Sequence, residues 1–146
     1  MASVSTYFNF PGTAEEAFNF YRSVFGGEFA GPIYRFAEMP PEPGKPPLSE
    51  ADQQLVMHVA LPILGGHLIM GTDATEGMGF KWAGGNHTYV SLNPDTRAEA
   101  DRLFAGLSAG GKVETSMQDM FWGAYFGSFT DRFGVNWMIN CEKSAT

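Results

Sequence analysis

The chain has 146 residues, of which 44% are hydrophobic and 17% are charged, and its formal net charge at pH 7 is −7. Such a chain is long enough and apolar enough to bury a core, which makes it globular rather than disordered. Its nine lysines and arginines are scattered along the sequence, which argues against nucleic acid and anionic membrane surfaces as partners.

The cysteine content and the N-terminal sequence exclude further classes of protein. The single cysteine, Cys141, excludes an internal disulfide and a metal site with several thiolate ligands. The N-terminus has neither the basic nor the apolar region of a signal peptide, and no run of about 18 apolar residues is present to span a membrane. We therefore expect a cytoplasmic protein.

The first half of the chain predicts a strand, a helix and three further strands. Strand-like runs occupy residues 5–10, 28–36, 55–64 and 67–73. The helix follows Thr13, whose spacing from Glu16 fits a capping box, and it stops at Gly26. Gly65 and Gly66 predict a hairpin turn between the last two strands.

The second half repeats this order of elements. Strand-like runs occupy residues 87–92, 112–117, 124–130 and 135–141, with a turn at 131–134. The helix has a capping box at Thr96 and Glu99 and stops at Gly110. When residues 9–27 are placed over residues 93–111, six positions are identical, which indicates an internal repeat.

Each half is therefore β-α-β-β-β. We predict an α+β protein with a single domain, residues 1–146, made of two modules at about 1–73 and 86–146. Residues 74–85 join the modules as a loop that carries Met78, Phe80 and Trp82. With three large apolar side chains, this loop is as compatible with covering a cavity or forming an oligomer interface as with lying on the surface alone. A second loop, at 39–54, holds five prolines, which cannot donate to a sheet.

Residues 14–28, 56–58, 67–73 and 122–137 are similar to those of a known family. The chain resembles the PhnB-like branch of the vicinal-oxygen-chelate superfamily, which includes glyoxalase I, bleomycin-resistance proteins and extradiol dioxygenases. The resemblance covers nearly the whole chain. It implies the glyoxalase/bleomycin resistance-like fold, in which two βαβββ modules with curled mixed sheets surround a pocket. It also implies a homodimer, with the modules paired within a chain or across the dimer.

Active members of that superfamily often bind a divalent metal through His, Gln or Glu on four strands. The resemblance places Thr6, Met70, Tyr89 and Met138 at the corresponding positions. Thioethers are poor ligands for hard or borderline divalent ions, and both methionines suit an apolar cavity lining better. Two histidines that met across strands would be too few for another site. We therefore expect no metal and no other cofactor.

Strand alternation assigns side chains to the expected cavity. In the last strand, Trp137 and Ile139 are expected to pack under a helix, which turns Asn136, Met138 and Asn140 toward the cavity.

The first strand is expected to turn Thr6, Phe8 and Phe10 inward. The fifth strand is expected to turn His87, Tyr89 and Ser91 inward. The full set of predicted ligand-binding residues is Thr6, Phe8, His58, Met70, Tyr89, Trp122, Asn136, Met138 and Asn140.

An aromatic and thioether-rich set with a few hydrogen-bonding groups suits a small, partly aromatic organic ligand bound without a metal. The second hypothesis is an enzyme of the same superfamily, a lyase, isomerase or dioxygenase, for which the sequence identifies no catalytic residue. The third is an interaction module, motivated by Phe80, Trp82 and Phe121. Some relatives carry a 3-demethylubiquinone methyltransferase label, but no Gly-rich strand-loop-helix suited to S-adenosylmethionine is present here.

Overall fold

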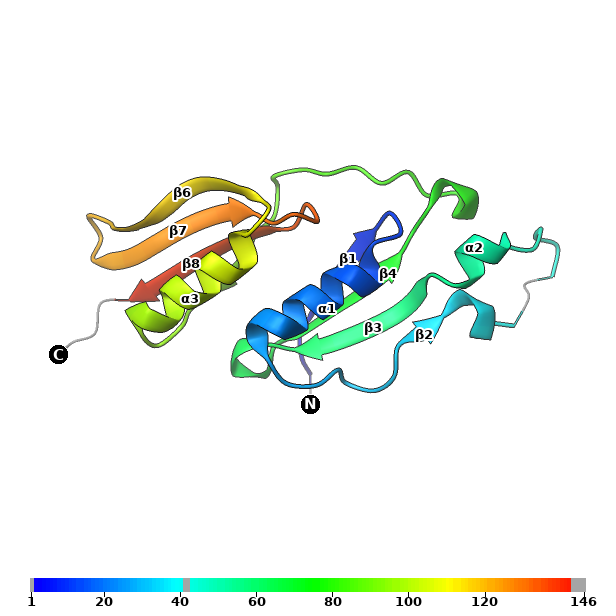
Figure 1. The fold of residues 1–146 in the computed structure, drawn as a ribbon, viewed down its shortest axis with the longest axis horizontal. Coiled ribbons are helices and arrows are strands. Elements are labelled where there is room, and N and C mark those ends of the chain that lie inside the picture. The colour runs from blue at the N-terminus through cyan, green and yellow to red at the C-terminus, as the bar shows by residue number, and fades with distance from the viewer. Residues whose placement is uncertain (1, 41–42, 143–146) are drawn as a thin grey trace. The chain divides into compact units, whose positions relative to one another are not determined.

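The computed structural model describes residues 2–40 and 43–142. Their contacts divide the chain into two compact units, of which the first ends at Ala83 and the second begins at Gly84. Each unit contains one four-stranded sheet and one long helix (Figure 1). The boundary lies inside the loop that was expected to join two modules.

The first unit has the order strand, helix, three strands. Its sheet runs β1-β4-β3-β2, with β1 parallel to β4, and with β3 antiparallel to both β4 and β2. The elements are β1 (Thr6–Phe10), α1 (Ala14–Phe25), β2 (Tyr34–Arg35), a short helix α2 (Glu50–Gln53), β3 (Val56–Pro62) and β4 (Leu68–Asp73). Single 3-10 turns lie at Phe36–Glu38, Leu64–Gly66 and Glu76–Met78.

The second unit repeats this topology. Its sheet runs β5-β8-β7-β6, with β5 parallel to β8 and the other pairs antiparallel. The elements are β5 (Val90–Leu92), α3 (Arg97–Ser108), β6 (Lys112–Asp119), β7 (Ala124–Thr130) and β8 (Asn136–Glu142). In both units the first strand lies parallel to the last, so the predicted α+β fold with two βαβββ modules is confirmed.

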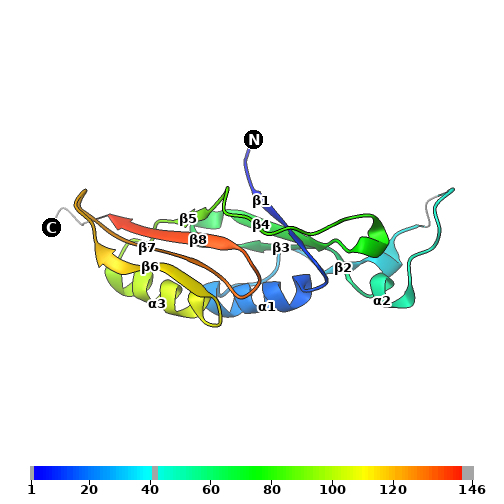
Figure 2. The ribbon, with the colours of Figure 1, turned by 90° about the horizontal axis from the view of Figure 1, so that it is seen from above.

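Each helix covers one face of its own sheet, and the core lies between them (Figure 2). In the first unit, Phe18 and Tyr21 of α1 pack against rings of β1. Gly71 of β4 lies directly beneath α1, because a Cβ there would lie 2.5 Å from the ring of Phe18. In the second unit, Gly127 of β7 lies in the same way beneath Phe104 of α3.

Both predicted turns between strands are confirmed. Gly65 and Gly66 join β3 to β4 with positive φ angles of 68° and 82°. The amide of Gly134 donates to the carbonyl of Asp131 between β7 and β8. Within the described residues, no helix is long and apolar enough to cross a membrane.

The predicted strand at 28–36 is wrong for most of its length. Only Tyr34–Arg35 pairs with β3, and residues 36–38 form a 3-10 turn. Gly31 adopts a φ of +88°, which breaks the extended conformation, and Pro32 has no amide hydrogen for a sheet. The predicted strand at 87–92 is likewise shortened, since β5 begins only at Val90.

The two helix starts differ from the paired capping boxes expected. The hydroxyl of Thr96 accepts the amide hydrogen of Glu99 at 3.1 Å, whereas the side chain of Thr13 makes no capping bond. At α1 the carboxylate of Asp73, at the end of β4, accepts the amide of Ala14 instead, at 2.8 Å. A residue 59 positions away therefore caps the first helix, which local spacing does not reveal.

This difference makes the two threonines a matched pair. Thr96→Ala should lower the free energy of unfolding by about 1 kcal/mol, the usual loss for an N-cap hydroxyl. Thr13→Ala should change it by less than about 0.5 kcal/mol, because no capping bond is lost. Urea unfolding measures both variants, and equal losses would contradict the assigned caps.

Candidate functional site

The face of the second sheet that is turned away from α3 gathers most of the predicted site residues. Trp137 and Ile139 of β8 are fully buried on the α3 side. Because side chains alternate along a strand, Asn136, Met138 and Asn140 point to the opposite face. The predicted packing of Trp137 and Ile139 under a helix is therefore confirmed. We call the face opposite α3 the outer face of the second sheet.

The centre of the outer face is a row of three small or flexible side chains. Met138 of β8 lies between Ser91 of β5 and Ser128 of β7, since it is paired with both in the sheet. Met138 is half-buried, and Ser128 is 8% exposed. The row offers two hydroxyl groups beside an adaptable thioether, which suits contact with an organic molecule.

A tyrosine and a glutamate form a bridge across one end of the outer face. The hydroxyl of Tyr89, just before β5, donates to the carboxylate of Glu114 on β6, with oxygen distances of 2.8 and 2.9 Å. β5 and β6 are the two edges of the sheet, three strand spacings or roughly 14 Å apart. The two side chains therefore extend over β8 and β7. Glu114 comes within reach at a register shift between Val113 and Thr115.

Asn136 lies in the same row as this bridge and is held by three hydrogen bonds. Its amide nitrogen donates to the carbonyls of Gly85 and Thr88 at 2.7 and 3.1 Å, and its amide oxygen accepts from the hydroxyl of Thr130 at 2.8 Å. Only 8% of Asn136 is exposed. Its contacts are those of an anchor that fixes the segment leading to Tyr89, rather than those of a free ligand-binding group.

Aromatic side chains occupy the other end of the outer face. Phe126 of β7 is paired with Asn140 of β8, and the ring of Trp122 packs edge-on to Phe126 at 5.9 Å. Trp122 is 51% exposed in the turn between β6 and β7. Asn140 follows Asn136 by four positions in β8, or about 13 Å along the strand. A polar and thioether strip of small-molecule length therefore lies between the tyrosine bridge and the aromatic end.

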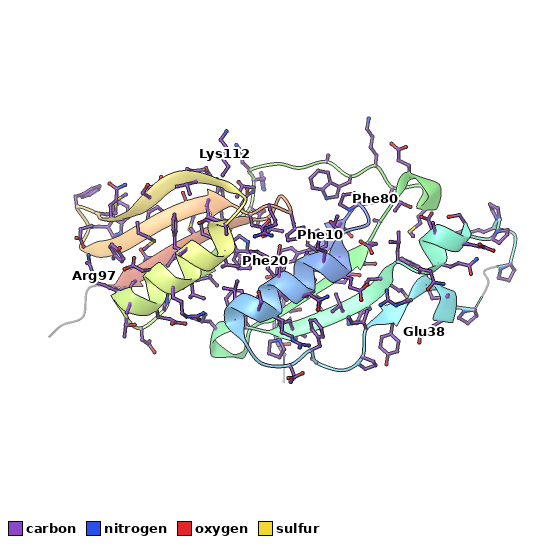
Figure 3. All side chains as sticks on the ribbon, in the orientation of Figure 1. Phe10, Phe20, Glu38, Phe80, Arg97 and Lys112 are labelled. Atoms are coloured by element: carbon purple, nitrogen blue, oxygen red, sulfur yellow. The ribbon has the colours of Figure 1, made fainter. Side chains whose placement is uncertain are left out.

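Tyr125, in the same strand as Phe126, lies on the opposite face. Its hydroxyl donates to Asp101 of α3, and the guanidinium of Arg97 lies 3.9 Å from its ring centroid. Arg97, labelled in Figure 3, also pairs with Asp119 of β6. These contacts fasten α3 to its sheet and leave Tyr125 outside the site.

The hydrogen bond to Glu114 raises the pKa of Tyr89 above its ordinary value of about 10. A raised pKa in the folded state means that the bond contributes to stability below the pKa of the unfolded tyrosine. That contribution is lost as the pH rises through the higher folded value. The tyrosine is therefore a neutral donor at physiological pH.

Replacing Glu114 by alanine should lower the pKa of Tyr89, because both the hydrogen bond and the adjacent negative charge disappear. NMR titration of the Tyr89 ring between about pH 8 and 12 measures its pKa in the wild type and in the variant. An unchanged pKa in Glu114→Ala would contradict the bridge.

The first sheet also has a face turned away from its helix, and two predicted residues lie there. Met70 of β4 is paired with Tyr7 and Ala60, on the side opposite Gly71. His58 of β3 is paired with Tyr34 of β2. Both side chains belong to the first unit.

The predicted inward direction of the first strand is wrong. The ring of Phe8 lies 6.5 Å from that of Phe18 and 6.3 Å from that of Tyr21, both on α1. Phe10, labelled in Figure 3, is 1% exposed and also packs on Phe18. Thr6 shares this face by alternation, and its hydroxyl bonds to the His67 ring at 2.8 Å. The aromatic rings are part of the helix-covered core.

The residues expected at the superfamily's metal positions do not form a ligand set. Thr6 faces α1, whereas Met70 faces the other side of the same sheet. Tyr89 and Met138 share the outer face but offer a phenol and a thioether. Across residues 2–40 and 43–142, no three His, Cys, Asp or Glu side chains are grouped so as to hold a metal ion. The residues present therefore do not fit a divalent metal at these positions.

Sequence reasoning missed two members of the outer face, Ser128 and above all Glu114. The signal for Ser128 was present, since it alternates with the buried Phe129 along β7. Glu114 had no such signal, because a register shift in β6 determines where it points.

Comparisons with known proteins agree with this fold. A family model described as the Glyoxalase/Bleomycin resistance protein/Dioxygenase superfamily matches residues 7–139. The Escherichia coli (strain K12) protein YjdN is 32% identical over 145 residues, which cover 96% of this chain and 95% of YjdN.

Two solved structures are similar over almost their full length. Protein PA1353 from Pseudomonas aeruginosa has a TM-score of 0.84 and 34% identity, covering 99% of this chain and 100% of its own. A Bacillus cereus protein named as a putative 3-demethylubiquinone-9 3-methyltransferase, PhnB protein, has a TM-score of 0.74 and 26% identity. That likeness covers 96% of this chain and 99% of the Bacillus protein.

Proposed function

The chain belongs to the glyoxalase/bleomycin resistance protein/dioxygenase superfamily, and on that premise we propose that it is a PhnB-like member that binds a small, partly aromatic organic ligand without a metal ion. We place the binding surface on the outer face of the second sheet. The observation that carries the proposal is the arrangement of this face, with aromatic rings at both ends and a thioether between two hydroxyl groups at its centre.

The chemistry of this face favours binding over catalysis by a metal. Contact with aromatic rings and a thioether removes the apolar surface of a flat ligand from water, which lowers the free energy of the complex. The hydroxyl groups of Ser91 and Ser128 and the amide of Asn140 provide a few directional hydrogen bonds, as small-molecule sites usually do. Neither imidazole nor thiolate lies in these rows to hold a divalent ion.

A calorimetric titration with 1-naphthalenemethanol tests the proposal. This probe is neutral and carries a flat aromatic body with one hydroxyl group. We expect saturable binding with one site per chain, and the same Kd in protein treated with a chelator and in untreated protein. A Kd that rises at least tenfold after chelation would contradict binding without a metal.

Trp122→Ala should weaken this binding about tenfold, because removing an aromatic contact at a binding surface costs on the order of 1–2 kcal/mol. Trp82→Ala is the matched control. Trp82 is also partly exposed, but it belongs to the first unit, where its indole donates to the carbonyl of Asn9. We expect its Kd to stay within about twofold of the wild-type value. Equal losses in both variants would contradict the placement of the ligand.

The alternative function, an enzyme of the same superfamily acting on a carbonyl or catechol substrate, makes a different prediction. It requires a stoichiometric divalent ion in protein purified without chelator, held by protein side chains. Elemental analysis of such a preparation discriminates the two functions. One bound ion per chain would favour the enzyme.

A further inference from the structure

We infer that the outer face of the second sheet selects ligands that carry a protonated nitrogen, an organic ammonium or guanidinium group beside an apolar body, and that Glu114 is the group that recognises it. This inference rests on the proposed function, because it names the ligand class of the same face. It goes beyond that proposal by assigning a charge to the ligand and a role to a residue on the edge strand.

The position of Glu114 is the first support. Its carboxylate receives the Tyr89 hydroxyl from the opposite edge of the sheet, so its two oxygens are held over the outer face. Tyr89 supplies a single hydrogen to these oxygens, whereas a carboxylate offers about four acceptor positions. The acceptor positions that remain are available to a donor on a ligand.

The partners of Glu114 are the second support. Among the described residues, its only hydrogen-bond partner is Tyr89, and no lysine or arginine forms an ion pair with it. Lys112, labelled in Figure 3, is exposed two residues earlier on β6 and is paired with Thr130, so it lies at the same end of the outer face. Within the described residues it forms no ion pair with Glu114. The carboxylate of Glu114 therefore accepts a hydrogen bond from a neutral phenol and is not paired with a cation.

The rest of the face is the third support. Its middle rows contain hydroxyl, thioether, amide and aromatic groups, with no basic side chain to compensate an anionic ligand. The faces of Tyr89, Phe126 and Trp122 carry the negative ends of aromatic quadrupoles, which attract cations. The formal charge of −7 on the whole chain favours approach of a cation in the same direction.

Three probes with one scaffold test the inference in calorimetric titrations of the full chain. They are 1-naphthylmethylammonium, 1-naphthalenemethanol and 1-naphthoate. We expect the ammonium probe to bind about tenfold more tightly than the alcohol, and the carboxylate probe to bind at least tenfold more weakly than the alcohol, as for partly exposed charge pairs.

Glu114→Gln removes the charge and keeps an acceptor for Tyr89. This variant should bind the ammonium probe about tenfold more weakly than the wild type and the alcohol within about twofold. Tyr89→Phe should keep the preference for the ammonium probe, because the carboxylate remains. Asp95→Asn is the control, since Asp95 is exposed in the turn before α3 and loses the same unit of charge.

The outcomes separate this inference from the function on which it rests. Equal affinity for all three probes, or an unchanged preference in Glu114→Gln, would overturn the ligand charge and leave the binding function standing. A loss in Asp95→Asn as large as that in Glu114→Gln would assign the preference to overall charge and overturn the role of Glu114. Failure of every probe to bind would overturn the proposed function itself.

Discussion

Replacing Asp131 by alanine should lower the free energy of unfolding by about 3–4 kcal/mol, because three donors in the second unit lose their acceptor together. Asp131 is buried, with 3% of the residue exposed. It accepts the amides of Phe133 and Val135 at 2.8 and 3.0 Å and the indole N–H of Trp137 at 2.9 Å. The indole belongs to a fully buried side chain, so water cannot replace this partner easily.

Urea unfolding followed by tryptophan fluorescence measures this loss. Asp95→Ala is the control, since Asp95 is exposed and should change the free energy of unfolding by less than about 0.5 kcal/mol. Asp131→Asn should fall between the two, because its amide keeps one acceptor oxygen. A loss below about 1 kcal/mol in Asp131→Ala would mean that the three bonds do not stabilise the β7–β8 turn as described.

The second large effect concerns the ligand. Met138→Arg should weaken binding of the neutral probe 1-naphthalenemethanol at least about hundredfold, or by roughly 2.7 kcal/mol. Met138 occupies the middle of the central row, between Ser91 and Ser128. An arginine there would fill the strip between the tyrosine bridge and the aromatic end, and it would bring a strongly hydrated charge to the surface that the ligand must cover.

Val113→Arg is the matched control for this variant. Val113 lies on the same sheet but is paired with Phe129, so it points to the face covered by α3, and it is 43% exposed at the edge. We expect its Kd to stay within about twofold of the wild-type value, with circular dichroism confirming the fold of both variants. A Met138→Arg protein that is folded and binds normally would exclude the outer face as the ligand site.

The last strand was predictable because its alternation is strong. Trp137 and Ile139 are large and apolar, and their intervening neighbours are polar or flexible, so burial assigns the faces without further information. The two glycines between β3 and β4 were equally informative, since both adopt the positive φ that favours glycine. Local patterns of this kind also predicted both long helices and most strand positions.

The direction of the side chains in the first strand was predicted wrongly, because it was assigned by analogy with the family's pocket. Phe8 and Phe10 are the largest apolar side chains of β1 and gain most by packing against α1. Contacts between residues far apart in the sequence could not be predicted either. The cap from Asp73 to α1 and the bridge from Tyr89 to Glu114 join residues 59 and 25 positions apart. Neither follows from a short motif, since each depends on strand order and register.

We propose that a small aromatic ligand binds on the outer face of the second sheet, over Met138 and between Tyr89 and Phe126. Intermolecular NOEs between 1-naphthalenemethanol and protein labelled at methionine methyl groups and aromatic rings test this placement. We expect NOEs from the naphthalene protons to the Met138 methyl group and to the rings of Tyr89, Phe126 and Trp122. NOEs confined to the first unit, or to side chains under α3 such as Phe104, would contradict it.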